Sequence, residues 1–148
     1  MKEIYPTVAI DYGMKNLGLA ISDSKGVMAS PLKVVSITKK RNIDTVIKEI
    51  LELCSEYNVK RLVVGKPQEF TKKHRKTTEK IDAFLVKLKS FTNIPIVTYD
   101  EAFSTADAQN MLTSSGQNIR SSKKKIDSIA ATLFLQEFLN FENKKNEK

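Results

Sequence analysis

The stretch that decides the fold is residues 8–26, VAIDYGMKNLGLAISDSKG. It begins as an apolar strand that stops at Asp11, turns at Gly13, and resumes as a second apolar run that ends in another glycine-containing turn. Because the connections are too short for a crossover, consecutive strands here must be antiparallel neighbours. The predicted strands of this part are 7–11, 17–22 and 32–37.

Helix and strand patterns alternate through the rest of the chain. Apolar residues spaced by three and four predict helices, and short apolar runs between them predict strands. Ser104 is the expected N-cap of a helix over about 104–114, with Asp107 in a near capping box and Gly116 ending the helix. The other helices are expected over about 42–57, 74–90 and 122–141, with strands over 61–65 and 94–100. This order predicts an α/β fold in which helices cover both faces of a mixed central β-sheet.

Length and composition favour one domain. With 148 residues, 41% of them hydrophobic, the chain has the size of a single domain, expected over 1–141 with a frayed tail over 142–148. We see no signal-peptide pattern and no apolar run near the roughly 18 residues of a membrane span, so we expect a cytoplasmic protein with no membrane partner. Cys54 lies in the apolar series of a predicted helix, which indicates a buried, inert thiol.

The positive charge is concentrated in two stretches. The formal net charge is +8 at pH 7, and residues 66–76 and 120–125 each contribute a local sum of +4. Such clustering suits a polyanion such as nucleic acid, although solvated loops and helix ends could carry the same charge for solubility.

Acidic residues stand at the ends of two predicted strands. In open α/β sheets ligands bind beyond the carboxyl ends of the strands, which directs attention to Asp11 and to the pair Asp100 and Glu101. Both positions have a plain structural alternative. Asp-x-Gly is common in turns, and acids before a helix are favoured by the helix dipole.

A third acid, Asp127, shares the apolar arc of the last predicted helix with Ala130, Ala131 and Phe134. A buried carboxylate needs a cation or a strong hydrogen-bond partner, and a salt bridge to a lysine is one solution. If three acids converge, each pair at about 5 Å costs on the order of 3 kcal/mol at an effective dielectric near 20. A hard cation such as Mg²⁺ or Mn²⁺ would relieve this repulsion, whereas one histidine and one cysteine do not make an ordinary zinc site.

Four stretches in order resemble the YqgF (RuvX) family, small bacterial proteins of the RNase H-like fold related to the RuvC Holliday junction resolvases. They are IDYGMKNLGLAISD, VVGKP, YDEAFST and KKKIDSIAATLFLQEFL, and they span most of the chain. The resemblance implies a metal-dependent nuclease with one or two Mg²⁺ or Mn²⁺ ions held by Asp11, Glu101 and Asp127, with Asp100 as the rival to Glu101.

The chain departs from the family pattern at several cations. The first motif usually has a basic pair where this chain has Lys15 and Asn16, and an arginine usually stands where this chain has Ala102. The family's Gly-Leu-Pro reads Gly65-Lys66-Pro67 here. Phosphate contacts are expected from Lys15, Lys66, Lys72, Lys73, Arg75, Lys76, Lys123, Lys124 and Lys125.

The leading hypothesis is therefore phosphodiester hydrolysis, which the resemblance links to the 5′ end of pre-16S rRNA and to ribosomal precursor particles. The alternatives are a Holliday junction resolvase acting on branched DNA and a non-catalytic RNA-binding factor in ribosome assembly. A phosphotransferase of the actin and hexokinase type is disfavoured because no second Asp-x-Gly half is present. The sequence leaves RNA against DNA and monomer against homodimer open, and a resolvase would need a two-fold dimer.

Overall fold

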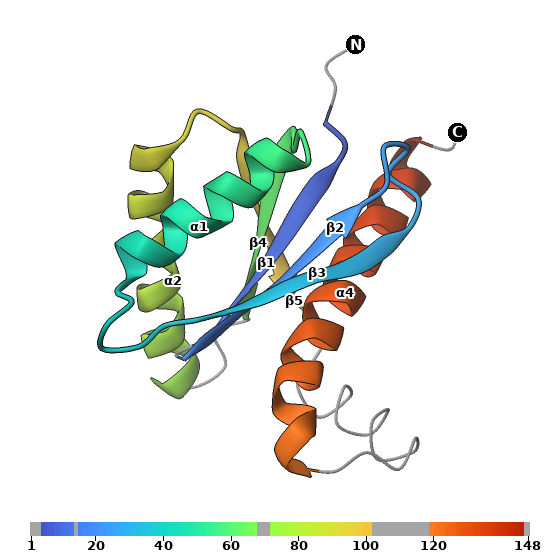
Figure 1. The fold of residues 1–148 in the computed structure, drawn as a ribbon. Helices are drawn as coiled ribbons and strands as arrows, with labels where there is room; N and C mark the ends of the chain where they lie inside the picture. The colour runs from blue at the N-terminus through green and yellow to red at the C-terminus, as the bar shows by residue number, and fades with distance from the viewer. Residues whose placement is uncertain (1–3, 14, 68–71, 102–118, 147–148) are drawn as a thin grey trace.

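The computed structural model describes residues 4–13, 15–67, 72–101 and 119–146 and contains a five-stranded mixed sheet (Figure 1). The strand order is β3-β2-β1-β4-β5. β1 pairs antiparallel with β2 and β2 with β3, whereas β4 is parallel to both β1 and β5. The strands are β1 (Thr7–Tyr12), β2 (Asn16–Ser22), β3 (Ala29–Ser36), β4 (Arg61–Pro67) and β5 (Ile96–Glu101). The antiparallel arrangement of the first three strands is confirmed.

The turn between β2 and β3 depends on Gly26. Its φ of +71° lies in the left-handed region that favours glycine, and a Cβ there would meet the ring of Tyr5 at 2.3 Å. Asp23 completes the turn by accepting the backbone N–H of Val27 at 2.8 Å. The hairpin is therefore closed by local hydrogen bonding and by contact with the segment before β1.

β3 begins at Ala29, three residues before its predicted start. Pro31 cannot donate a ladder hydrogen bond, but β3 is an edge strand, where proline is tolerated. The register shifts between Leu19 and Ala20, which pair with Lys33 and Pro31, so Leu32 is the extra residue of a β-bulge. The edge position and the bulge together keep a proline within the strand.

Two helices cover one face of the sheet, α1 (Ile43–Glu56) and α2 (Lys72–Phe91) (Figure 1). The side chain of Asn42 caps α1 by accepting the backbone N–H of Thr45 at 3.0 Å. Cys54 is 2% exposed in this core, so the prediction of a buried core thiol is confirmed, and burial raises the pKa of this thiol to about 11. The fully buried members of this core include Ile10, Leu17, Leu19, Ile47, Ile50, Leu62 and Leu88.

One long helix, α4 (Ile119–Asn146), covers the other face. Its buried residues Ala131, Phe134, Leu135 and Leu139 pack against Ala9, Ala20 and Val63 of the sheet. Helices therefore lie on both faces, as predicted.

The expected end of α4 at Phe141 was wrong, because the helix continues to Asn146 and residues 142–146 are helical rather than frayed. Both carboxylate oxygens of Glu142 accept hydrogen bonds from Arg61, at 2.7 and 2.8 Å, and Asn143 donates to the carbonyl of Gly26 at 3.1 Å. These contacts hold the last turns against the start of β4 and the hairpin. The assignment of residues 1–141 to a single domain stays a prediction.

Among the described residues, no helix is both long and apolar enough to cross a lipid bilayer. The helix predicted over 104–114, with its capping residues, lies outside the described residues.

Candidate functional site

Asp11 is the predicted site residue whose surroundings are described most fully. It is the fifth residue of β1, is half-buried and pairs with Gly18 of β2. Side chains alternate along a strand, and Ala9, two residues earlier, packs against α4. Asp11 therefore lies on the α4 face of the sheet, close to the carboxyl end of β1.

Two glycines flank Asp11 in the sheet. On one side its partner is Gly18. On the other, the last β1–β4 pair joins Ile10 and Val64, so Gly65 stands next to Asp11, one residue beyond that pair. Glycine within a strand often marks close approach of a ligand, because no side chain occupies the space above the sheet. The signal that could have singled out Gly18 and Gly65 in the sequence is glycine inside two otherwise apolar strand patterns.

The strand register separates the two acids at the end of β5. Val97 and Tyr99 pack against the α4 core, whereas Ile96 packs against the α1–α2 core. By alternation, position 101 belongs to the α4 face and position 100 to the opposite face. In the ladder with β4, Glu101 pairs with Pro67 and Asp100 with Lys66. Backbone position 101 thus shares both a face and an edge of the sheet with Asp11.

The direction of α4 determines where position 127 lies. Glu142 contacts Arg61 at the start of β4, and Phe134 stacks on Tyr99 near the end of β5, with ring centroids 5.9 Å apart. The helix therefore runs antiparallel to these strands, and its first half heads for their carboxyl ends. Position 127 precedes the buried Ala131 and Phe134 by four and seven residues, which puts it on the sheet-facing stripe.

The structure thus brings the backbone positions of all three predicted acids to one face and one edge of the sheet. Their side chains are described only for Asp11. Within the described side chains no group of three His, Cys, Asp or Glu residues gathers. Carboxylates at these three positions, beside the two glycines, would suit a hard divalent cation, which prefers oxygen ligands.

The predicted phosphate-binding cations lie in segments that begin or end at this same edge of the sheet. Lys15 is exposed in the turn between β1 and β2, and Lys66 is the sixth residue of β4. The residues at 72–76 form the beginning of α2, which starts at Lys72, two residues before the predicted start of this helix. The residues at 123–125 lie in the first turns of α4.

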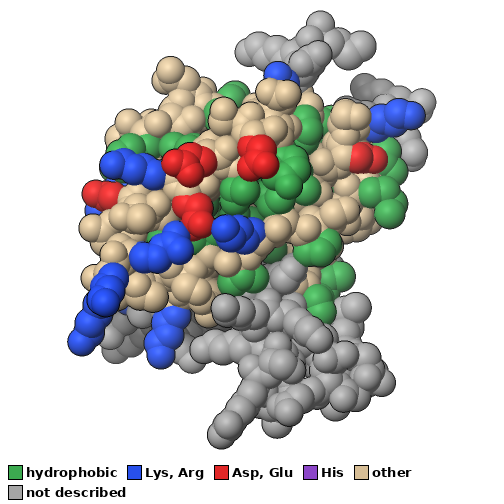
Figure 2. Space-filling model, viewed as in Figure 1, with side chains coloured by type: hydrophobic (Ala, Val, Ile, Leu, Met, Phe, Trp, Pro, Cys, Tyr) green, Lys and Arg blue, Asp and Glu red, His purple; other side chains and the backbone are tan. Residues whose placement is uncertain are grey.

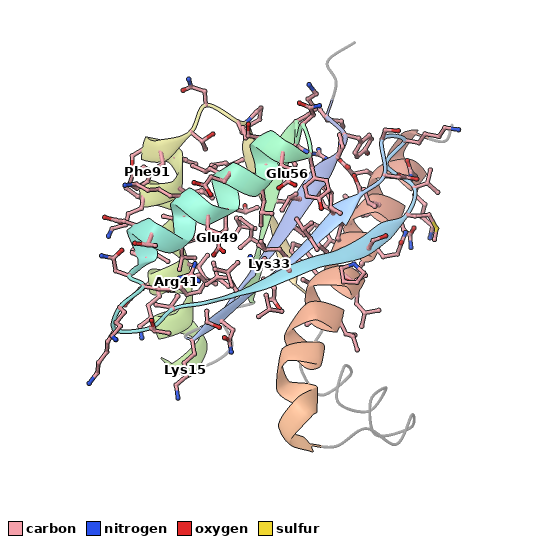
Figure 3. All side chains as sticks on the ribbon, in the orientation of Figure 1. Lys15, Lys33, Arg41, Glu49, Glu56 and Phe91 are labelled. Carbon is pink, nitrogen blue, oxygen red and sulfur yellow. The ribbon has the colours of Figure 1, made fainter. Side chains whose placement is uncertain are left out.

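A third basic run was missed in the sequence. Lys39, Lys40 and Arg41 lie between β3 and α1, and the backbone N–H of Ile37 just before them donates to the carbonyl of Lys15 at 2.7 Å. Arg41 and Lys33 both bind Glu49 (Figure 3). Figure 2 shows Lys and Arg side chains gathered on this lower-left side of the molecule. The signal was present as three consecutive cations next to an N-cap.

Solved structures that superpose on this chain identify its fold class. RuvC of T. thermophilus in complex with a Holliday junction substrate superposes with a TM-score of 0.55 at 13% identity, covering 93% of this chain and 94% of RuvC. The fowlpox virus resolvase bound to Holliday junction DNA superposes with a TM-score of 0.52 at 16% identity, covering 92% and 97%. The fold is thus the RNase H-like fold of the RuvC-type resolvases.

The family follows from the sequence matches. The model described as "RuvX: Holliday junction resolvase" matches residues 6–141, and the chain belongs to this family. It is 32% identical over 133 residues to a protein of Desulforudis audaxviator, covering 90% of this chain and 92% of the relative. It is 34% identical over 135 residues to a protein of Fusobacterium nucleatum, covering 90% and 95%. Both relatives carry the name "Putative pre-16S rRNA nuclease".

Proposed function

We propose that this chain is a nuclease that hydrolyses phosphodiester bonds in precursor 16S rRNA, at the 5′ end, during ribosome biogenesis in the cytoplasm. Membership of the RuvX family and the similarity to relatives named for pre-16S rRNA support this function. Its partners are then precursor rRNA and the ribosomal precursor particles that contain it. The net charge of +8 suits such a polyanionic substrate.

The proposed catalytic acids are Asp11, Glu101 and Asp127, which would hold one or two Mg²⁺ or Mn²⁺ ions. The observation that carries this assignment is the position of Asp11 between Gly18 and Gly65 on the α4 face. Strand alternation favours Glu101 over Asp100 as its partner, because position 101 has the parity of the residues that pack on α4. Bound metal would activate the attacking water and stabilise the charge on the leaving oxygen.

The chain's own residues have three tasks in this proposal. The three carboxylates would supply hard oxygen ligands to a divalent ion. The two glycines leave space for the phosphodiester to approach the sheet closely. Lys15 and the basic residues of β4, α2 and α4 attract and orient the phosphate backbone, which adds affinity and salt sensitivity but little sequence preference. Selectivity then depends on the shape of the nucleic acid.

The test is cleavage of a labelled precursor rRNA fragment that carries its 5′ extension, in Mg²⁺, Mn²⁺ or EDTA. Metal-assisted charge stabilisation contributes several kcal/mol, so Asp11→Asn, Glu101→Gln and Asp127→Asn should each reduce the rate on the order of a thousandfold. Asp100→Asn is the matched control and should change the rate by less than about tenfold. Full activity of Asp11→Asn, or equal losses in the variants at 100 and 101, would reject this site.

A second candidate function is resolution of four-way DNA junctions. The family description and the fold shared with junction-bound resolvases favour it. Symmetric cleavage of a junction requires a two-fold dimer. Junction cleavage by a dimeric protein that leaves the rRNA intact would therefore select this function, and salt-dependent RNA binding without cleavage in any divalent ion would indicate a non-catalytic assembly factor.

A further inference from the structure

A hollow of about 370 Å³ opens on the α1–α2 face of the sheet, at the edge that carries Asp11. Tyr12, the last residue of β1, and Ile43, the first residue of α1, form its end nearest the sheet edge. One side of α2 forms the opposite wall. The lining residues are Tyr12, Ile43, Lys80, Ala83, Phe84 and Lys87.

The floor of the hollow is aromatic and apolar. The rings of Tyr12 and Phe84 contact each other with centroids 5.1 Å apart, and Ile43 and Ala83 complete the surface. Phe84 is 2% exposed and supports the partly exposed Tyr12 from below. Such a floor suits a flat ring that stacks on Tyr12.

Cations surround this floor. Lys80 and Lys87 are exposed on α2, seven residues and therefore about 10 Å apart along the helix. Lys87 pairs with Asp44 at 3.1 Å, but both side chains are about half exposed, so a phosphate can compete with the carboxylate at low cost. Lys15 follows Tyr12 by three residues and is exposed in the adjacent turn. An apolar floor with positive charges at its rim matches a nucleotide, which has a flat base and an anionic backbone.

We propose that this hollow receives an unpaired base of the nucleic-acid strand that is cut, next to the scissile phosphodiester. The inference rests on the proposed function, because it places the scissile bond at Asp11. Asp11 and Tyr12 are consecutive, with Cα atoms about 3.8 Å apart, and face opposite sides of the sheet. A nucleic-acid strand that passes over this edge of the sheet presents a phosphodiester to Asp11 and the neighbouring base to Tyr12.

The substrate class follows from this geometry. In a continuous duplex the bases are stacked and paired, so none can enter the hollow without being extruded, which costs a few kcal/mol. An unpaired base enters without that cost. The preferred substrate is therefore nucleic acid, RNA or DNA, with a single-stranded stretch at the cleavage site.

Binding is measured by fluorescence anisotropy in EDTA, so that the result does not depend on hydrolysis. The probes are a fluorescein-labelled oligouridine, a labelled oligothymidine and a labelled duplex of the same length. Ala83→Glu places a carboxylate in the hollow, and Val86→Glu makes the same charge change on the same helix at a residue that is 70% exposed and does not line the hollow. Ala83→Glu should weaken single-strand binding about tenfold relative to Val86→Glu, and the two variants should bind the duplex alike.

Substitution of the ring itself gives a second test. Tyr12→Leu should weaken single-strand binding about tenfold, whereas Tyr12→Phe, which keeps the stacking surface, should bind within about twofold of the wild type. Equal single-strand affinities of Ala83→Glu and Val86→Glu, or tighter wild-type binding to the duplex, would overturn the inference. Ring-dependent single-strand binding without hydrolysis of any substrate would support the hollow and count against the proposed nuclease activity alone.

Discussion

Replacing Glu142 by glutamine tests how α4 is held against the sheet. Arg61 is almost enclosed, with 9% of its side chain exposed, and donates to both oxygens of Glu142 at 2.7 and 2.8 Å. Its guanidinium lies 5.0 Å from the ring centroid of Phe138 and 5.5 Å from that of Tyr5, whose hydroxyl donates to Glu142 at 2.9 Å. Glu142→Gln removes the only formal negative charge in this group and leaves a buried cation without its anion.

The expected loss of stability is about 2 kcal/mol. Breaking a wholly buried ion pair by removing one partner costs about 3–5 kcal/mol. The Glu142 side chain is 21% exposed, and glutamine keeps one acceptor oxygen, so water and the amide recover part of that cost. For a domain of this size such a loss lowers Tm by about 4–8 °C.

The ion pair of Arg61 and Glu142 should also change how the stability of the fold depends on pH. Burial alone raises the pKa of Glu142, but the hydrogen bonds from Arg61 and Tyr5 and the charge of Arg61 outweigh it and hold the pKa below its ordinary 4.5. A carboxyl group whose pKa is lower in the folded state stabilises the fold above its unfolded pKa. That contribution is lost as the pH falls from about 4.5 through the folded pKa. Glutamine does not titrate, so the variant should lack this part of the acid dependence.

Urea unfolding followed by circular dichroism, at neutral pH and across the acid range, measures both effects. Glu52→Gln is the matched control, because Glu52 is exposed on α1, and it should stay within about 0.5 kcal/mol of the wild type. If the free energy of unfolding of Glu142→Gln matches that of this control, or if the variant keeps the full acid dependence of the wild type, the ion pair does not hold α4 against the sheet.

Three further predictions concern other parts of the molecule. Gly26→Ala should lose about 1–3 kcal/mol in urea unfolding, because its φ is +71° and its Cβ would overlap the Tyr5 ring; unchanged stability would contradict this. Cys54, with its pKa raised to about 11, should react with a thiol reagent at pH 8 only as fast as the protein unfolds, and rapid labelling of the native protein would be inconsistent with its burial. Addition of Mg²⁺ or Mn²⁺ should raise Tm by relieving carboxylate repulsion, and Asp11→Asn should abolish most of that shift; an equal shift in the variant would place the bound metal elsewhere.

Most of the fold could be predicted because its signals are local. The apolar runs of β1, β2 and β4 are buried on both sides, so their hydrophobic pattern is continuous and plain. The element ends were less predictable. The last turns of α4 look polar and frayed in the sequence, and their contacts with distant residues, such as that of Glu142 with Arg61, 81 residues away, explain why they remain helical.

The sequence by itself determined the α/β class, the antiparallel start of the sheet, the buried Cys54 and the three acids as candidates, because strand and helix periodicity and local charge are properties of neighbouring residues. Tertiary structure alone decided that the backbone positions of these acids share one face and one edge of the sheet, since this depends on the parallel pairing of β1, β4 and β5 and on the direction of α4. It also decided that two glycines stand beside Asp11 and that Tyr12 opens into a hollow behind it. These relations join residues far apart in the chain, and no local pattern encodes their distance.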